Sequence, residues 1–453
     1  KEDIHRVDRK IDAQSEELMR RQRLTDRKME ELDRKLSDLD EKTFKSEWAQ
    51  RIRFGGDIRL RYQGNYYDED NALLLDPNDP DRLLNTTNDR SRMRYRVRLG
   101  MKVKIVDPRD VNVGKVEVGV RLSTGNQKNP VSTNDTFGDY FNNDGIVFDR
   151  AYLKYTYKAD EPLWGKNIPQ FMATGGRIPN PWFYTNLLWD HDLNFEGAAI
   201  NFYTDTQDIT QWKGFLTAGV FPLQEDAFSS SCDKWLYAGQ VGFEYKPRFD
   251  VATKLGFAYY DYDNIVGEVN DPLRPGEKDC SAPLFFQKGN TLFDIDPSSN
   301  IKPALASDYK LVNITGKFDL GIYHPVHIIL IGDYVKNIGF DRKEVAQRTG
   351  NPDVSEEDEG YQIGMTVGYP KINEFGEWNV FFTYRYLEAD AVLDAFTDSD
   401  FHDGGTNAKG WILGGSLGLY RNLWLKARWL TSNEISGPQL SIDTLQVDLN
   451  ARF

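Results

Sequence analysis

Cationic side chains recur at every second position in one stretch of the sequence. Arg92, Arg94, Arg96 and Arg98 alternate with other residues, and Lys102 continues the series. Like charges at this spacing repel one another, which a dry core does not tolerate but a water-filled space screens. We therefore expect these residues to line an aqueous pore and to attract anions. The alternative is an internal ladder that carboxylates balance, with no role in solute passage.

Further cations occupy equivalent positions in other segments with the same alternation. The expected pore-lining residues are Arg59, Arg61, Arg92, Arg94, Arg96, Arg98, Lys102, Arg121, Arg385, Lys426 and Arg428. Most of them lie near the start or the end of the alternating region, and these ends become neighbours if the strands close into a barrel. The sequence therefore predicts one cationic side of the wall and a modest preference for small anions.

Residues suited to enzymatic or metal chemistry are sparse. The chain has five histidines, and no serine-containing nucleophile motif accompanies any of them, so we expect no catalytic residues and no enzyme. The acidic segment 76–81 could bind Ca²⁺, but it lacks the spacing and turn glycine of a dedicated site, so no cofactor or metal site is expected. A formal net charge of -14 disfavours a nucleic-acid partner.

The two cysteines, Cys232 and Cys280, match no metal-ligand spacing. Both fall in long connections between predicted strands, which we expect to lie on the outer side of a membrane. Because an oxidising surface favours disulfides, we expect these residues to form one between adjacent loops.

The element that must position the cations is a β-strand with one apolar face. No run approaches 18 consecutive apolar residues, which excludes a helical membrane span but not an alternating strand. Sixteen such segments are expected, at 53–63, 92–105, 112–123, 147–158, 169–176, 195–204, 212–221, 235–246, 250–262, 309–318, 326–336, 361–369, 378–387, 410–418, 422–431 and 442–453.

The connections between these segments alternate in length, long then short. An even strand number with short turns at one end and long loops at the other is typical of an outer-membrane barrel. We therefore predict an all-β transmembrane fold, a 16-stranded antiparallel up-and-down barrel over 51–453. Aromatic residues make up 13% of the chain, and they suit the two membrane interfaces. Acidic residues concentrate in 64–91, 337–359 and 389–408, which predicts a negative outer mouth.

Residues 1–47 differ from the rest, since they contain no glycine or proline and show a seven-residue repeat. Ile4, Ile11, Leu18, Leu32 and Leu39 belong to this series, which predicts a coiled coil that self-associates. The alternative is a single helix lying on its own domain. The charged start shows no export signal, so we expect either a cytosolic protein or a mature exported one.

Three segments resemble known outer-membrane proteins. The chain ends in 445–453 with apolar residues at alternate positions and a terminal Phe453, which resembles the C-terminal assembly signal of bacterial outer-membrane proteins. Segments 175–182 and 188–197 resemble the "putative porin" family of Gram-negative bacteria, whose members often carry an N-terminal coiled coil. The resemblance implies a homotrimer in the outer membrane, surrounded by lipid and lipopolysaccharide, with the coiled coil in the periplasm.

The resemblance also implies that the third long loop, about 177–194, folds into the barrel and narrows it. Asp190, Asp192 and Glu196 would then face the arginines across the constriction. The function expected from these features is passive diffusion of small hydrophilic solutes. Two alternatives are a structural tether to peptidoglycan through the coiled coil and a barrel that surrounds a periplasmic electron carrier.

Overall fold

The computed structural model describes residues 28–29, 31–35, 49–106, 114–158, 167–206, 211–226, 232–298 and 301–453. The chain divides into two compact units, Lys1–Arg53 and Phe54–Phe453. In the first unit the residues 28–29, 31–35 and 49–51 are helical, and Lys35 pairs with Glu31 at 2.7 Å. Most of the segment predicted as a coiled coil lies outside the described residues. Among the helices that the structure describes, none is long and apolar enough to cross a membrane.

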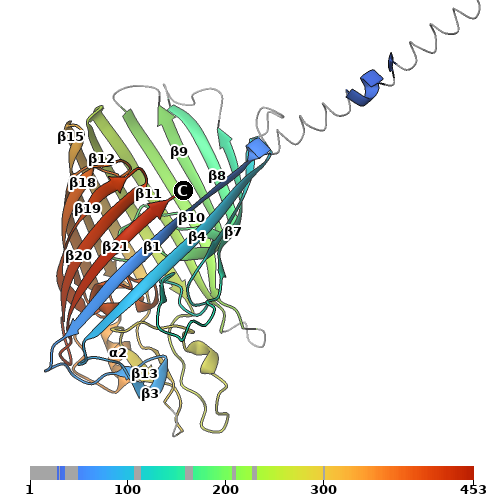
Figure 1. Cartoon of the computed structure of the whole chain (residues 1–453). Helices are drawn as coiled ribbons and strands as arrows, with labels where there is room; N and C mark the ends of the chain where they lie inside the picture. The colour runs from blue at the N-terminus through green and yellow to red at the C-terminus, as the bar shows by residue number, and fades with distance from the viewer. Residues whose placement is uncertain are drawn as a thin grey trace, which may run out of the picture. The chain divides into compact units, whose positions relative to one another are not determined.

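In the second unit the predicted barrel is confirmed, and each expected segment forms a strand (Figure 1). The sixteen barrel strands in the described part of the chain are β1 (Ile52–Tyr67), β4 (Arg90–Val106), β5 (Lys115–Ser123), β7 (Val147–Lys158), β8 (Asn167–Pro179), β9 (Asn194–Thr206), β10 (Gln211–Gln224), β11 (Lys234–Arg248), β12 (Val251–Asp263), β15 (Lys310–Tyr323), β16 (Val326–Asn337), β17 (Glu359–Gly368), β18 (Trp378–Leu387), β19 (Ala408–Tyr420), β20 (Leu423–Glu434) and β21 (Ser441–Arg452). Each pairs with its neighbours in sequence.

The first and last strands close the barrel. β1 pairs with β21 in an antiparallel register that runs from Asp57 opposite Arg452 to Tyr67 opposite Ile442. The terminal Phe453 adds two backbone hydrogen bonds with Gly56, of 2.9 and 3.1 Å. Closure leaves neither strand with an unpaired edge along this register, which a sheet in a membrane requires.

Alternation along each strand separates the interior from the outer wall. In β1, Arg61 and Gln63 are buried, whereas Ile58 and Leu60, which precede them at positions of the opposite parity, are exposed on the outside. Because successive side chains point to opposite faces, one polar and one apolar face follow directly from the sequence pattern.

Aromatic side chains pair on the outer wall near both strand ends. Tyr361 stacks on Tyr386 at 5.3 Å near the long-loop end, and Trp212 stacks on Tyr245 at 4.1 Å near the opposite end. Rings with a polar atom suit the two interfaces of a membrane. The positions therefore agree with the expected aromatic belts.

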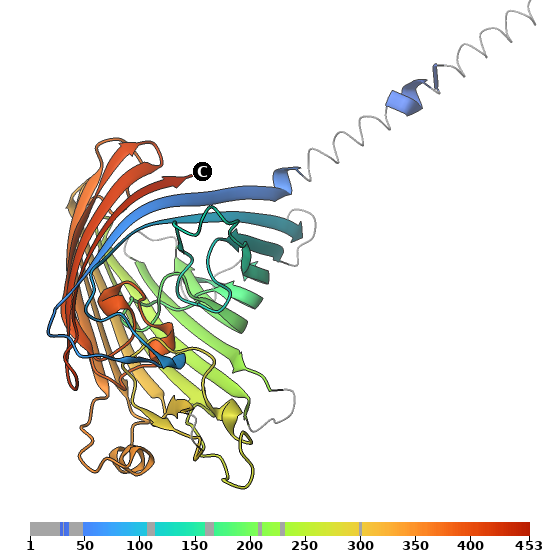
Figure 2. The ribbon, with the colours of Figure 1, turned by 60° about the horizontal axis from the view of Figure 1, so that its bottom comes forward.

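The long connections gather at one end of the barrel, where they carry short elements (Figure 2). These elements are β2 (Leu75–Asp76), β3 (Asp79–Leu83), β6 (Asp135–Thr136), η2 (Asp279–Ser281), β13 (Leu292–Asp294), β14 (Pro303–Leu305), α2 (Arg342–Thr349), η3 (Asp394–Phe396) and η4 (Phe401–Asp403). We call 124–146 loop 2, 180–193 loop 3, 264–309 loop 5 and 388–407 loop 7. Asp341 caps α2 by accepting hydrogen bonds from the backbone of Lys343 and Glu344.

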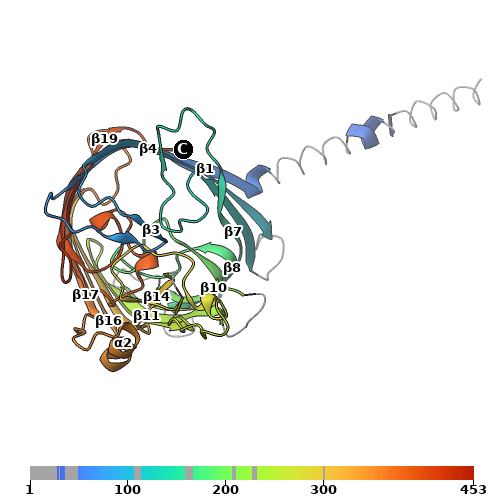
Figure 3. The same ribbon diagram turned by 90° about the horizontal axis from the view of Figure 1, so that it is seen from below.

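Loops 3 and 7 lie inside the barrel, and the view from the long-loop end shows segments crossing its opening (Figure 3). An apolar cluster contains Trp182 and Trp189 of loop 3, Leu393 of loop 7, and the wall residues Phe221 and Tyr260. Trp182 meets Tyr260 edge to face at 5.5 Å, and Trp189 meets it at 5.3 Å. Loop 3 is therefore held against one side of the wall by aromatic packing.

Candidate functional site

A cavity of about 360 Å³ lies between the cationic wall and loops 3 and 7. The cations that line it come from β1, β4, β5, β7 and β20, whose inward positions alternate with apolar outward ones. They are Arg59, Arg61, Arg96, Arg98, Arg121, Arg150, Lys426 and Arg428. The carboxylates that line it are Asp190, Asp192, Asp398, Asp400 and Asp448. We call this cavity the constriction.

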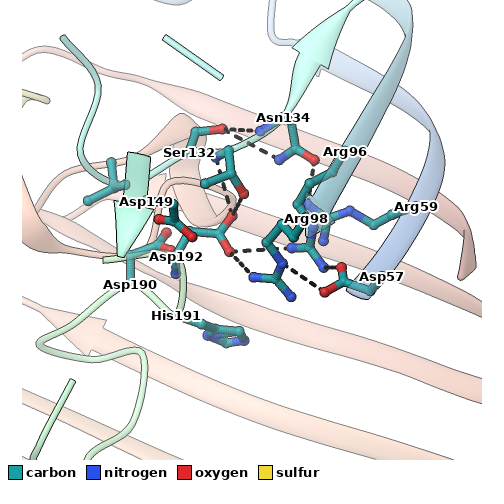
Figure 4. Close-up of polar contacts among 12 residues, drawn as sticks. Asp57, Arg59, Arg96, Arg98, Ser132, Asn134, Asp149, Asp190, His191 and Asp192 are labelled. Atoms are coloured by element: carbon teal, nitrogen blue, oxygen red, sulfur yellow. Dashed lines mark hydrogen bonds and ion pairs between the residues drawn. The ribbon is translucent and has the colours of Figure 1, made fainter. Parts of the chain in front are cut away.

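Loop 3 meets the cationic wall through one carboxylate, as Figure 4 shows. Arg96 and Arg98 donate to Asp192 at 3.3 and 3.2 Å, and both also donate to Asp57, at 2.8 and 2.9 Å. Thr133 of loop 2 donates its hydroxyl to Asp192 at 2.9 Å. Burial opposes the ionisation of Asp192, but the two guanidinium groups outweigh it and lower the pKa of this carboxyl.

Asp190 contacts loop 7, whereas Asp192 contacts the arginines of the wall. Its carboxylate accepts from the backbone of Asp192 at 2.7 Å, and from the backbone and hydroxyl of Ser399 in loop 7 at 2.8 and 2.9 Å. Burial, reinforced by the nearby Asp192 and Asp398, raises the pKa of Asp190. Asp190 therefore fastens loop 3 to loop 7, and no arginine of the described residues lies at ion-pair distance from it.

Loop 7 supplies a second set of counter-charges to the wall. Asp400 accepts from Arg61 at 2.8 Å and from Arg428 at 2.6 Å. Arg61, which is 1% exposed, also pairs with Asp448 at 2.7 Å. Buried ion pairs of this kind keep loop 7 attached to the wall, because separating the partners would leave buried charges uncompensated.

Three lining cations have no carboxylate at ion-pair distance in the described part of the chain. Arg59 donates to the side chain of Asn134, Arg150 donates to Asn194 at 2.7 Å, and the Lys426 ammonium lies 5.1 Å from the centre of the Phe381 ring. Eight cations and five carboxylates line the constriction, and two further carboxylates, Asp57 and Asp149, pair with lining arginines from outside the lining.

Four of the residues expected to line the pore do not line the constriction. Arg92 and Arg94 face inward nearer the long-loop end, where Arg92 lies 3.7 Å from Asp403 and Arg94 donates to Gln63 at 3.2 Å. Arg385 is buried against Asp398 at 3.1 Å and anchors loop 7. Lys102 is exposed and does not line the cavity.

Glu196 also differs from its expected position. It lies on β9 rather than in loop 3, is 60% exposed, and pairs with Arg177 on β8. Phe195 beside it is buried, but Glu196 itself does not line the constriction.

The acidic segment 389–408 does not form an outer mouth. Asp390, Asp394 and Asp398 are buried inside the barrel, because loop 7 folds inward onto the cationic wall and onto loop 5. Sequence reasoning missed this role of loop 7. The sequence did contain an indication of this inward folding: loop 7 has several acidic residues and no lysine or arginine, so it complements a cationic wall.

One arrangement resembles a catalytic triad. His402 lies 3.0 Å from the Ser432 hydroxyl and 2.8 Å from a Glu434 oxygen. Both His402 and Ser432 are buried, and the serine hydroxyl donates to the carbonyl of Ile442. The group therefore ties loop 7 to β20 and offers no accessible nucleophile. Among the described residues no group of three or more histidine, cysteine or acidic side chains is placed to hold a metal ion.

Cys232 and Cys280 are joined in a disulfide, with Cα atoms 5.6 Å apart. Cys232 lies two residues before β11, and Cys280 lies in η2 of loop 5. The bond links consecutive long connections at the same end of the barrel.

The comparisons with known proteins agree with this architecture. The profile of a family described as "Putative porin" matches residues 39–453. The search of curated proteins found no match. Among solved structures, OprB of Pseudomonas putida at high pH is 10% identical with a TM-score of 0.50, over 91% of this chain and 97% of that one. OmpT of Vibrio cholerae, in vitro folded and in a trimer form, is 9% identical with a TM-score of 0.43, over 89% of this chain and 99% of that one.

Proposed function

The chain belongs to the "Putative porin" family of outer-membrane β-barrels, and we propose that it lets small hydrophilic solutes diffuse passively, with a modest preference for anions. The observation that supports the preference is the set of three lining cations, Arg59, Arg150 and Lys426, that have no carboxylate at ion-pair distance among the described residues. Low-dielectric walls focus the field of such clustered charges, so anions would be concentrated there. The carboxylates of loops 3 and 7 oppose the effect, which makes it modest.

Planar-bilayer recording of the purified protein tests this proposal. We expect open-channel steps, and a zero-current potential in a KCl gradient whose sign indicates a greater permeability to Cl⁻. At 1 M salt the preference should shrink, because the screening length falls to about 3 Å. A strongly cation-selective channel at low salt would contradict the anion preference, and a protein that never conducts would contradict the diffusion function.

We propose further that three barrels associate and that the segment 1–47 forms a periplasmic coiled coil that reinforces the trimer. The seven-residue repeat of the segment supports this, because so thin an apolar seam persists only with partners. Deleting 1–47 should leave a folded barrel, since barrel strands satisfy their own backbone hydrogen bonds. The full chain should be trimeric in mild detergent by light scattering, and a monomer at every concentration would contradict the proposal.

A further inference from the structure

A second cavity lies among the loops at the long-loop end and has a volume of about 560 Å³. This volume falls within the range of roughly 300–1,000 Å³ that is usual for small-molecule sites. Trp189 and Phe195 line it beside loop 3, Phe221 and Leu236 line it from β10 and β11, and Phe396 lines it from loop 7. We call it the vestibule pocket.

The vestibule pocket and the constriction lie on opposite sides of loop 3. Trp189 lines the pocket, whereas the next three residues, Asp190 to Asp192, line the constriction. One short turn therefore separates a mainly apolar cavity from a charged one.

The pocket contains a buried cation without a direct ion pair among the described residues, and Asp226 attracts it only from a longer distance. Lys234 is 2% exposed, and its ammonium donates to the Gln224 side-chain oxygen at 3.1 Å and to the Cys280 carbonyl at 2.5 Å. Within the described residues no carboxylate lies at ion-pair distance from it. An ammonium group has three donors, so one remains beyond these two contacts. A buried charge with only neutral acceptors is costly, and a bound anion would reduce that cost.

The remaining charges of the pocket favour the same ligand. Arg177 and Glu196 both line it and neutralise each other as an ion pair. Lys128 of loop 2 lines it as a further cation. The pocket thus combines aromatic and aliphatic walls with a positive balance of charge.

We propose that the vestibule pocket binds organic anions that carry an aromatic or similarly sized apolar body and a carboxylate group. Lys234 holds the carboxylate, and the apolar body packs among Trp189, Phe221 and Phe396. This binding site goes beyond a diffusion pore, since occupancy of the pocket does not depend on conduction through the constriction.

The disulfide helps to shape this pocket. Pro283, Leu284 and Phe285 form part of its wall and follow Cys280 closely in the chain. The carbonyl of Cys280 accepts a hydrogen bond from the Gln224 side-chain amide at 2.9 Å, besides the one from the Lys234 ammonium. The bond to Cys232 therefore fixes both the covering segment and one acceptor of the buried ammonium.

Binding of phenylacetate to the purified full chain tests the proposal, followed by calorimetry and by saturation-transfer NMR. Acetate, which lacks the apolar body, and phenylacetamide, which lacks the charge, are the matched probes. We expect phenylacetate to bind in a saturable manner. Each matched probe should bind with an affinity at least about tenfold lower. The variant Lys234→Met should lose about tenfold in affinity for phenylacetate, whereas Lys278→Met, which changes a half-buried loop-5 cation outside the pocket, should change that affinity little.

Phe285→Ala provides a second test with the ammonium intact, and it should weaken phenylacetate several-fold while leaving acetate unchanged. The heat-modifiable gel mobility of each variant reports whether the barrel has folded. Unsaturable uptake of phenylacetate, or equal affinity in the wild type, Lys234→Met and Phe285→Ala, would overturn the proposal. Because the readout is binding, that result would leave the conductance test of the pore unaffected.

Discussion

The interior of the barrel has two sides that are built by opposite chemistry. One side, formed by β1, β4, β20 and β21, carries Arg61, Arg96 and Arg428 and meets loops 3 and 7 through carboxylates. The other side, formed largely by β9 to β12, carries Phe221 and Tyr260 and meets loop 3 through tryptophans. Loop 3 therefore has an apolar surface and an acidic one.

This difference gives loop 3 two kinds of support. On the apolar side aromatic packing holds the loop, and the vestibule pocket adjoins it there. On the charged side the constriction keeps a volume of about 360 Å³, and three of its cations have no carboxylate at ion-pair distance among the described residues. We propose that solutes pass on the charged side.

Trp182→Ala should produce the largest effect, on the apolar side. Removing a buried tryptophan costs on the order of 3–5 kcal/mol, which would loosen the docking of loop 3 by a hundredfold or more. Hydrogen exchange of the loop 3 amides should accelerate accordingly. Trp212→Ala, on the exposed outer wall, is the matched control and should leave these amides protected. Equal protection in both variants would mean that the charged contacts alone hold the loop.

Replacing residues 391–404 of loop 7 by a short Gly-Ser linker should raise single-channel conductance several-fold. This segment contains Asp398 and Asp400, which meet the cationic wall, and Leu393 and Phe396, which pack on the apolar side. Its loss removes one boundary of the constriction, while the strands keep their backbone hydrogen bonds. Unchanged conductance would show that solutes avoid the cavity beside loop 7.

The double change Arg96→Gln and Arg98→Gln should alter selectivity more than conductance. Both residues line the constriction, so their loss should shift the zero-current potential in a KCl gradient toward cations. The double change Arg92→Gln and Arg94→Gln is the matched control, since both residues face inward on the same strand but lie nearer the long-loop end. This control should shift the zero-current potential less. A larger shift from the control pair would place the selective region nearer the long-loop end.

Loop 7 should dock less firmly as pH rises. Burial, opposed by hydrogen bonds from the backbone of Gln287 and Ala395, raises the pKa of Asp394 from its ordinary value of 3.8 to about 7. A carboxyl whose pKa is raised by folding favours the folded state while it is protonated, and this advantage is lost as pH rises from 3.8 to about 7.

Current noise from loop 7 should therefore grow modestly between pH 5 and pH 8, and Asp394→Asn should remove the dependence. The same growth in the Asn variant would assign the effect to another group.

The strands could be predicted because their pattern is local. The alternation around Arg96 requires only that successive side chains face opposite sides, and it predicted β4 to within two residues at each end. The ring of strands followed from the alternating loop lengths. The disulfide partners followed from the presence of two cysteines in adjacent long connections.

The constriction could be predicted only in part, because it depends on contacts between segments far apart in sequence. Asp192 was expected to face the arginines, and it does contact Arg96 and Arg98. Asp400 was missed because nothing local indicates that loop 7 turns inward. Glu196 was misplaced because its pairing with Arg177 on β8 is a contact that the local pattern does not indicate.

The pairing of β1 with β21 has a consequence for biogenesis. Arg61 and Asp448 form a buried ion pair across 387 positions of chain, so the contact exists only once the final strand has been delivered. A chain that ends early would expose the edge of β1 and leave Arg61 without this partner, and such edges invite aggregation. Ring closure thus requires a complete β21, since this strand supplies the pairing partners that one edge of β1 would otherwise lack.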